Sequence, residues 1–365
     1  MLGIAFSLLL GASAFIQPAW ALQKDTVYFK NGQPITMDKF LSGLREQRVI
    51  LVGETHDRYD HHLHQLRIIH EIHKYYPDVA IGLEYFQAPF QTKLDDFTQG
   101  RSNTIQMLRE TEYYLRWRFD HRLYEPIFNF ARDNQIPLVA LNVAAEITRK
   151  VSAQGLNSLS ETERKQIPAD IDRSDKTYRE RLKTIFKQHY AHSENAVFEN
   201  FYDVQLLWDE GMAETAAEYL SKHPTKKMII LAGMGHIEYG AGIPKRLERR
   251  IKDKVATVVP VDDAADAGVA EYVFKSTVAN LPRRGLLGLF LEPDPGNQVR
   301  SVTALGPASV AGVKPGDVIT AINEDPISDL TDIKVSLSHK RPGDTIALQV
   351  SREPEQTVTL NVELD

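Results

Sequence analysis

Cysteine is absent from this sequence of 365 residues. A chain without thiols forms no disulfide and offers no thiolate ligand, so any metal ion must be held by His, Asp, Glu or Tyr side chains. For the same reason we expect no acyl anchor of the kind that bacterial lipoproteins carry on an N-terminal cysteine.

Long runs of a single charge are also missing. The sequence carries 43 basic and 49 acidic residues, which gives a formal net charge of −6. A protein that binds nucleic acid normally shows a basic patch or a strongly basic composition. We therefore expect no nucleic acid and no other polyanion among its partners.

Residues 1–15 carry no charge and are mostly apolar, and Ala19-Trp20-Ala21 supplies the small-x-small pattern that precedes a cleavage site. This pattern predicts a signal peptide over residues 1–21. The alternative is a membrane anchor, but the apolar run is shorter than the roughly 20 residues that a spanning helix needs. We expect an exported protein of the periplasm or cell envelope.

Between residues 22 and 276, strand-like apolar runs alternate with helical patterns. A polar lead-in with a turn at Asn31-Gly32 comes first. Strands are predicted at 49–52, 79–83, 137–141, 228–232 and, as the last, 256–260. Helices are predicted at 37–44, 60–76, 89–134, 144–222 and 244–252, with breaks near 100–103, 155–160 and Pro168. The alternation predicts an α/β domain with a mostly parallel sheet flanked by many helices.

Three of these strands end in titratable side chains. The first delivers Glu54 and His56, the second Glu84 and Tyr85, and the fourth a glycine-rich loop with His236. In open α/β sheets the ligand crevice lies beyond the carboxyl ends of the strands. A single Glu or His in a loop is usually a solvated side chain, but three such strand ends predict one shared site.

Glu54, His56, Glu84 and His236 allow two kinds of chemistry. They can coordinate a divalent metal ion, or they can form a general base with an orienting carboxylate. In a hydrolase of either kind, Glu54 and His56 would activate water and His236 would stabilise charge.

Histidines are concentrated after the first strand. His61, His62, His64, His70 and His73 lie on the predicted helix 60–76. They do not share one face, so we expect most of them on a solvated surface. His62 is the exception, since it lies in the first turn of the helix beside the predicted cleft.

A mixed aromatic and cationic stretch contains Trp117, Arg118 and Tyr124. Such a surface can hold a flat anionic ligand, because aromatic rings stack on its faces while arginine pairs with its carboxylates. A phenolate can also ligate haem iron. The alternative is an amphipathic helix with ordinary core aromatics.

Residues 283–365 differ from the rest, being rich in Gly, Pro, Val and Ile. The segment Ala311-Gly312-Val313-Lys314-Pro315-Gly316-Asp317-Val318-Ile319, followed by Ile322-Asn323, resembles a mainly-β PDZ domain of bacterial envelope proteases. The resemblance implies that Leu287, Gly288 and Leu289 receive the carboxylate of a peptide or protein C-terminus, and that 332–338 is the helix lining the groove. Alternatively, the groove packs against the first domain.

Several short motifs of the first domain resemble ChaN, a family of iron-regulated haem-binding proteins of bacterial envelopes. They are Gly53-Glu54-Thr55-His56-Asp57 with His62 and Gln65, Leu83-Glu84, Leu141-Asn142-Val143, Trp208-Asp209-x-x-Met212-Ala213, and Ala232-Gly233-x-Gly235-His236 to Gly242-Ile243-Pro244. The resemblance implies haem stacked in pairs across a homodimer and held by tyrosine. Tyr124, in a Leu-Tyr-x-Pro motif, is then the first candidate ligand and Tyr85 the second.

ChaN is in turn similar to a wider superfamily that includes Tiki-type metalloproteases and erythromycin esterases. There the positions of Glu54, His56, Glu84 and His236 correspond to catalytic or metal-binding groups. The resemblance implies an exported haem-binding protein for iron uptake or haem handling, docked through a PDZ domain. The alternative is a metal-dependent or metal-free hydrolase, a peptidase or esterase.

Overall fold

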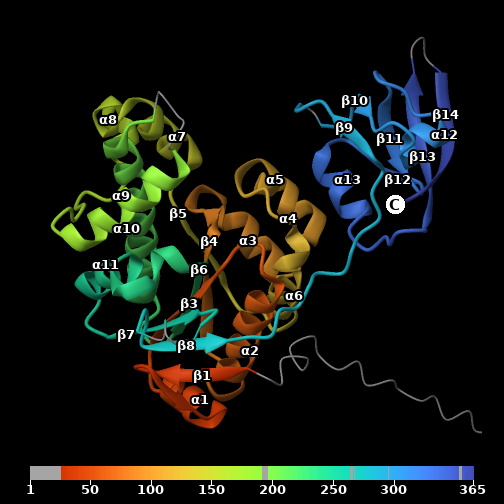
Figure 1. Ribbon diagram of the computed structural model, residues 1–365. Helices are drawn as coiled ribbons and strands as arrows, with labels where there is room; N and C mark the ends of the chain where they lie inside the picture. Colours follow the sequence, from red (N-terminus) through yellow and green to blue (C-terminus); the bar gives the residue numbers. More distant parts are fainter. Residues whose placement is uncertain (1–25, 191–195, 264–265, 267, 295, 353–355) are drawn as a thin grey trace, which may run out of the picture.

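A computed structural model describes residues 26–190, 196–263, 266, 268–294, 296–352 and 356–365 (Figure 1). The predicted signal peptide lies outside these residues. Among the described residues, no helix is both long enough and apolar enough to cross a membrane.

The first domain is built on one eight-stranded sheet with the order β2-β1-β8-β7-β3-β6-β4-β5. Its strands are β1 Val27–Lys30, β2 Gln33–Ile35, β3 Val49–Glu54, β4 Val79–Gln87, β5 Leu138–Asn142, β6 Lys227–Gly233, β7 Val255–Pro260 and β8 Tyr272–Lys275. From β8 to β5 neighbouring strands are parallel, and β1 pairs with β8 and β2 in antiparallel fashion. The predicted α/β class with a mostly parallel sheet is confirmed.

Helices cover both faces of this sheet (Figure 1). They are α1 Met37–Arg45, α2 Tyr59–Tyr75, α3 Gln91–Thr98, α4 Thr104–Glu110, α5 Tyr113–Arg116, α6 Glu125–Asp133, α7 Ala145–Gln154, α8 Glu161–Arg164, α9 Lys176–His189, α10 Phe198–Lys222 and α11 Ile243–Arg250. Alternate residues of β3 face opposite layers, as strand geometry requires. Ile50 and Val52 join the core formed with α1 to α6, whereas Val49 and Leu51 join the core formed with α10 and α11.

Three sequence predictions about this domain were wrong. The polar lead-in contains the β1–β2 hairpin, with its turn at Asn31 and Gly32, and β7 is followed by one more strand, β8. His61 and His64 do not face solvent. Because β1 and β8 cover α2, the ring of His64 stacks 5.5 Å from Tyr28 and 4.1 Å from Phe274. Burial lowers the pKa of His64 to about 3.

The C-terminal domain has its own strands, helices and apolar core. Its elements are β9 Leu289–Leu291, β10 Val299–Val302, α12 Pro307–Ala311, β11 Val318–Ile322, β12 Asp325–Pro326, α13 Leu330–Ser336, β13 Thr345–Arg352 and β14 Gln356–Glu363. The helix predicted at 332–338 begins two residues earlier, because the Asp329 carboxylate caps it by accepting a hydrogen bond from the Asp332 N–H.

Helix α13 faces α4 and α5 of the first domain (Figure 1). Arg109 of α4 forms ion pairs with Asp332 of α13 and with Asp329, which caps this helix. Two further pairs join the domains, Arg284 with Asp120 at 3.4 Å and His339 with Glu125 at 3.3 Å.

Candidate functional site

The four predicted site residues lie together at the carboxyl edge of the sheet. Strands β3, β6 and β4 are direct neighbours in the sheet although they are far apart in sequence. Glu54 is the last residue of β3, Glu84 lies in β4, and His236 ends the short 3-10 helix η5 Met234–His236 that follows β6. The sheet order therefore brings the titratable groups of three strand ends to one place.

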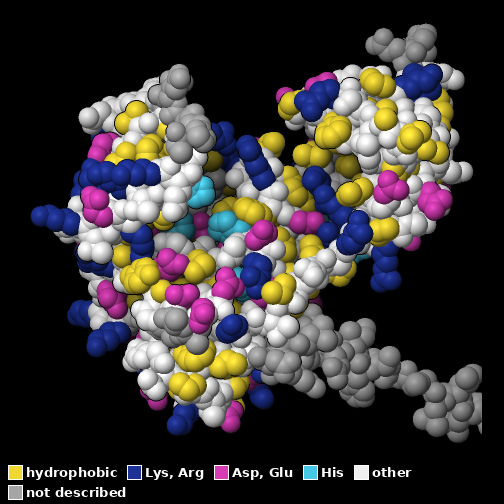
Figure 2. Space-filling view, viewed as in Figure 1, with side chains coloured by type: hydrophobic (Ala, Val, Ile, Leu, Met, Phe, Trp, Pro, Cys, Tyr) yellow, Lys and Arg dark blue, Asp and Glu magenta, His cyan; other side chains and the backbone are white. Residues whose placement is uncertain are grey.

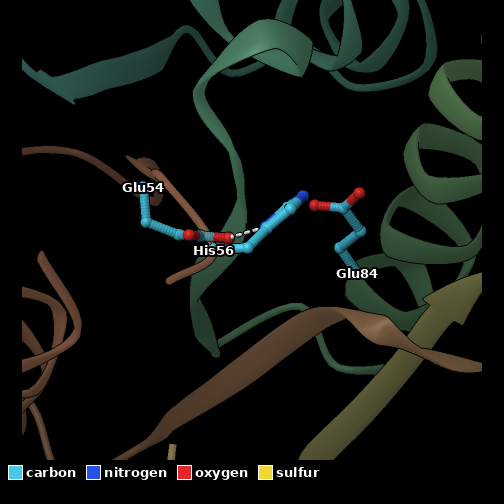
Figure 3. Close-up of side chains that lie close together, drawn as sticks. All are labelled: Glu54, His56 and Glu84. Carbon is cyan, nitrogen blue, oxygen red and sulfur yellow. Dashed lines mark hydrogen bonds and ion pairs between the residues drawn. The ribbon is translucent and has the colours of Figure 1, made fainter. Parts of the chain in front are cut away.

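Glu54 orients His56. The Glu54 side chain is buried, and its Oε1 lies 2.5 Å from Nδ1 of His56, whose side chain is 33% exposed. Burial opposes protonation of His56, but the hydrogen bond to Glu54 and the charges of Glu54 and Glu84 outweigh it and raise its pKa. Nε2 of His56 makes no hydrogen bond within the described part of the chain, and it points toward Glu84 (Figure 3).

The buried Glu84 and the partly buried His236 form a second pair. Oε2 of Glu84 accepts a hydrogen bond of 2.6 Å from the Gly233 N–H, and Oε1 lies 3.3 Å from Nε2 of His236. Gly233 leaves room for the His56 ring beside this pair, since a Cβ at position 233 would lie 2.8 Å from Cε1 of His56. Burial alone would raise the pKa of Glu84, but the His236 and His56 charges and the hydrogen bonds from His236 and Gly233 lower it.

Asp209 of α10 completes the surroundings of His236. Its Oδ1 lies 2.7 Å from Nδ1 of His236, and its Oδ2 accepts a hydrogen bond of 2.5 Å from the hydroxyl of Tyr178. His236 is thus held between two carboxylates. Burial opposes its charged form, but Glu84 and Asp209 together raise the pKa of His236 well above its ordinary value.

A cavity of about 340 Å³ opens beside these groups. Its wall consists of His56, Glu84, Tyr85, Gln87, Arg116, Trp117, Asn142, Val143, Ala145, Thr148, Gln205, Trp208 and His236. We call it the central pocket. Figure 2 shows histidine side chains next to apolar ones in a hollow of the first domain. The indole of Trp117 lies 4.7 Å from the His56 ring, so that an aromatic wall flanks the free nitrogen.

The residues also fit a divalent metal ion. Glu54, His56 and Glu84 each offer a ligand atom, and these atoms lie within 4.8 Å of one another (Figure 3). Oε2 of Glu54 is buried and has no hydrogen-bond partner among the described residues. The ring nitrogen that faces away from Glu84 contacts a carboxylate in both His56 and His236: Nδ1 of His56 contacts Glu54, and Nδ1 of His236 contacts Asp209. Metal-ligating histidines usually have such a partner.

Neither candidate tyrosine presents a free hydroxyl to the central pocket. Tyr124 is fully buried, accepts a 3.0 Å hydrogen bond from Trp117 Nε1 and donates one of 3.3 Å to the carbonyl of His56. The ring of Tyr85 lines the pocket, but its hydroxyl is buried. Burial, helped by the negative charge of Glu54, raises the pKa of both phenols well above its ordinary value, which disfavours a phenolate ligand.

The remaining predicted ligand-binding residues differ in accessibility. Trp117 lines the pocket, whereas the exposed Arg118 is not among its lining residues and has a positive φ of 72°. His62 is buried; its Nε2 lies 3.1 Å from the His56 carbonyl and its Nδ1 lies 3.1 Å from Gln65. His62 therefore supports the loop that carries His56 and does not open into the pocket.

A second concave surface lies in the C-terminal domain, between β9 and α13. This groove of about 530 Å³ is lined by Arg284, Gly285, Leu286, Leu287, Gly288, Leu289, Phe290, Leu291, Glu292, Pro293, Thr303, Leu330, Ile333, Lys334 and Leu337. It contains the predicted residues Leu287, Gly288 and Leu289. The exposed fractions of Leu286 and Phe290 are 49% and 55%, so the groove is open and not covered by the first domain.

Comparison with known families identifies both domains. The model of the family described as "Haem-binding uptake, Tiki superfamily, ChaN" matches residues 40–247, more than half of the chain. The chain belongs to the ChaN family. A PDZ-domain model matches residues 285–364, so a PDZ domain follows the ChaN domain.

Individual relatives agree with this division. The fold is that of ChaN of Campylobacter jejuni, a structure described as showing cofacial haem binding, with a TM-score of 0.57, 17% identity, and coverage of 70% of this chain and 98% of that one. Protein RETICULATA-RELATED 5 of Arabidopsis thaliana chloroplasts is 25% identical over 63% of this chain. A DegP-like periplasmic serine endoprotease of Bartonella henselae is 37% identical over 16% of this chain. The matches span only 34% and 12% of these two curated relatives.

Asp209, Tyr178 and Trp208 lie in or behind the site, and the sequence prediction did not assign them a role. Asp209 and Trp208 belong to the Trp-Asp-x-x-Met-Ala motif that marks the ChaN resemblance, so a signal was present. Tyr178 lies on α9 in no such motif. Only the hydrogen bond to Asp209 connects Tyr178 with His236.

Proposed function

We propose that this chain is an exported haem-binding protein of the ChaN family that serves iron uptake or haem handling. Family membership supports haem as the cargo, and the predicted signal at residues 1–21 supports export to the periplasm or cell envelope. The PDZ domain would dock the protein to the C-terminus of a partner.

The observation that carries the proposal is the position of His56. Its Nε2 makes no hydrogen bond within the described chain, its side chain is partly exposed, and Trp117 flanks its ring on the wall of the central pocket. Aromatic rings suit the faces of a porphyrin, and an imidazole nitrogen suits its iron. Arg116 on the same wall pairs with Glu112 and Glu146, so it would have to give up one of these partners to bind a propionate. We therefore propose His56 as the iron ligand in place of Tyr124, which would have to leave its buried position first.

Titration of the purified full-length chain with haemin tests this proposal. We expect a shifted and sharpened Soret band, which weakens strongly in His56→Ala and remains in Tyr124→Phe. His189→Ala, at the exposed end of α9, is a matched histidine control and should bind like the parent. A spectrum identical to that of free haemin would refute haem binding, and loss only in Tyr124→Phe would return the ligand to tyrosine.

Homodimer formation is part of the proposal, because ChaN of Campylobacter jejuni is described as binding haem cofacially. Stacked haems require two copies of the site. Light scattering after size-exclusion chromatography should show the mass of a dimer in the presence of haemin. A monomer mass at saturating haemin would contradict this part alone.

A second function, hydrolysis assisted by a divalent metal ion, is favoured by the ligand set of Glu54, His56 and Glu84. A bound ion would polarise the substrate and lower the pKa of a water molecule, while the partly buried His236 would provide a positive charge. Metal analysis of the purified chain should then find about one ion per chain. Hydrolysis of an ester or peptide should be lost in His56→Ala and in Glu84→Gln, and turnover retained in both variants would eliminate this function.

A further inference from the structure

A third cavity, of about 300 Å³, lies where the two domains meet. Its wall comes from the first domain, from the segment that joins the domains and from the residues that follow α13, namely Tyr59, Arg122, Glu125, Pro126, 281–283 and 338–341. We call it the interdomain pocket. It shares no lining residue with the central pocket or with the PDZ groove.

The wall of the interdomain pocket is rich in cationic side chains. Figure 2 shows lysine and arginine side chains on the surface where the two domains meet. Arg283, Lys340 and Arg341 form no ion pair and no side-chain hydrogen bond with the described part of the chain. Like charges that share one small cavity repel one another. The pocket therefore favours a ligand of negative charge.

Arg122 adds a guanidinium that is already fixed in position. Its side chain is only 11% exposed. Nε and Nη2 donate hydrogen bonds of 3.2 and 2.8 Å to Asp120, and Nη1 donates one of 3.0 Å to the carbonyl of Pro282. A guanidinium has five N–H donors, so two remain for a ligand. Because Asp120 already holds this side chain, a ligand would immobilise it at little further cost in entropy.

The negative charge on the wall is smaller than the positive charge. Glu125 is the acidic side chain among the lining residues, and its Oε1 lies 3.3 Å from Nε2 of His339. Asp120 balances the charge of Arg122. Even with a neutral His339, the three unpaired cations outnumber the single carboxylate of Glu125.

The size and the remaining walls of the pocket indicate a small organic or inorganic anion. Small-molecule sites usually measure about 300–1,000 Å³, so this cavity is at the lower end of that range. Tyr59, Pro126 and Leu281 provide an apolar side. Arginine pairs with phosphates and carboxylates through two parallel hydrogen bonds, and lysine adds a point charge. A ligand with two anionic groups can contact cations of both domains at once.

We infer that the interdomain pocket binds a small soluble anion that carries at least two phosphate or carboxylate groups. Its contacts would be Arg122 of the first domain, Arg283 of the joining segment, and Lys340 and Arg341 of the PDZ domain. The bound anion would therefore connect the two domains. This inference does not depend on haem or metal binding in the central pocket.

Isothermal titration calorimetry of the purified full-length chain tests the inference, with pyrophosphate and citrate as ligands and acetate at matched ionic strength as the comparison. We expect saturable binding of pyrophosphate or citrate with about one site per chain, and no saturable binding of acetate. The affinity should fall as sodium chloride is added, because salt screens partly exposed charges. Absence of saturable binding of both multivalent anions would overturn the inference.

Replacing Lys340 and Arg341 together with Gln should weaken binding about tenfold, because two partly exposed ion pairs are lost. Arg283→Gln is an independent variant and should weaken binding about threefold. The matched control is the double replacement of Lys187 and Arg300 with Gln, since both are exposed cations outside this pocket. The control should bind like the parent.

Two further outcomes would contradict the inference. Equal affinity in the parent, the Lys340 and Arg341 double variant and Arg283→Gln would place the anion elsewhere on the chain. Sedimentation of the chain with phosphatidate vesicles, without saturable binding of pyrophosphate or citrate, would assign these cations to a lipid headgroup and overturn a soluble ligand.

Discussion

Oε1 of Glu54 lies 2.5 Å from Nδ1 of His56 and thereby fixes which ring nitrogen faces the central pocket. With Nδ1 as the donor to Glu54, the lone pair of Nε2 is directed at the cavity. Glu54 is therefore a positioning residue for haem binding at His56, whereas in the proposed metal site it would also be a ligand itself.

Replacing Glu54 with Gln should weaken haemin binding by about tenfold to a hundredfold, the usual cost of losing a carboxylate behind a ligating histidine. The Soret band of the remaining complex should also change position, because a less basic imidazole donates less charge to iron. A purely structural role would lower the amount of folded protein without moving the band. Glu161→Gln, at an exposed glutamate of α8, should leave both quantities unchanged.

The convergence of the site was predictable, because it follows from the order of the strands. Glu54 ends β3, His236 follows β6 and Glu84 lies toward the carboxyl end of β4. Neighbouring parallel strands bring their carboxyl ends to one edge. Asp209 and Tyr178 follow no such rule. They lie on helices, and their partners are 27 and 31 residues away in the sequence.

The sequence also did not show which aromatic residues line the pocket and which are buried in the core. The stretch from Trp117 to Tyr124 indicates a ligand surface or a core equally well, and the fold divides it between the two. Trp117 lines the pocket, whereas Tyr124 is buried beneath it. The short strand β1 was missed because it has only one buried residue and gives no apolar run. Strand β8 is mostly buried but spans only four residues.

The ion pair of Glu84 with His236 predicts pH-dependent stability. The folded-state pKa of Glu84 lies below its ordinary value of 4.5. A carboxyl group with a lowered pKa stabilises the fold above the unfolded-state value, and this stabilisation is lost as the pH falls through the folded-state value. Glu84→Gln should therefore reduce the free energy of unfolding by about 3 kcal/mol near neutral pH.

Urea unfolding of parent and Glu84→Gln at a series of pH values checks this prediction. The difference in free energy between the two proteins should be constant near neutral pH and should shrink below about pH 4.5, as the parent takes up the proton. A difference that grows toward acid would show that Glu84 is protonated in the folded protein.

Replacing Glu210 should strongly lower the stability of the fold, although Glu210 does not line the central pocket. Its fully buried carboxylate pairs with Arg246 at 3.1 Å, Arg249 at 2.9 Å and Arg250 at 2.7 Å, all from α11. Glu210→Gln would leave the buried Arg246 without a counter-charge and should cost about 3–5 kcal/mol of unfolding free energy. Glu214→Gln, on the same helix but partly exposed, should cost less than about 1 kcal/mol in the same urea titration.

Arg109 helps to hold the PDZ domain against the first domain. Its side chain pairs with Asp332 and Asp329, whereas the apolar groove residues lie on the other side of α13. Arg109→Ala should therefore hold the PDZ domain less firmly against α4 and increase the radius of gyration in small-angle X-ray scattering, while peptide affinity stays within about twofold, because Arg109 does not line the groove. Arg101→Ala, which removes an exposed pair with Asp96 inside the first domain, should leave the radius unchanged. An unchanged radius in Arg109→Ala would show that the apolar contact of Val335 and the Arg284–Asp120 pair hold the domain without Arg109.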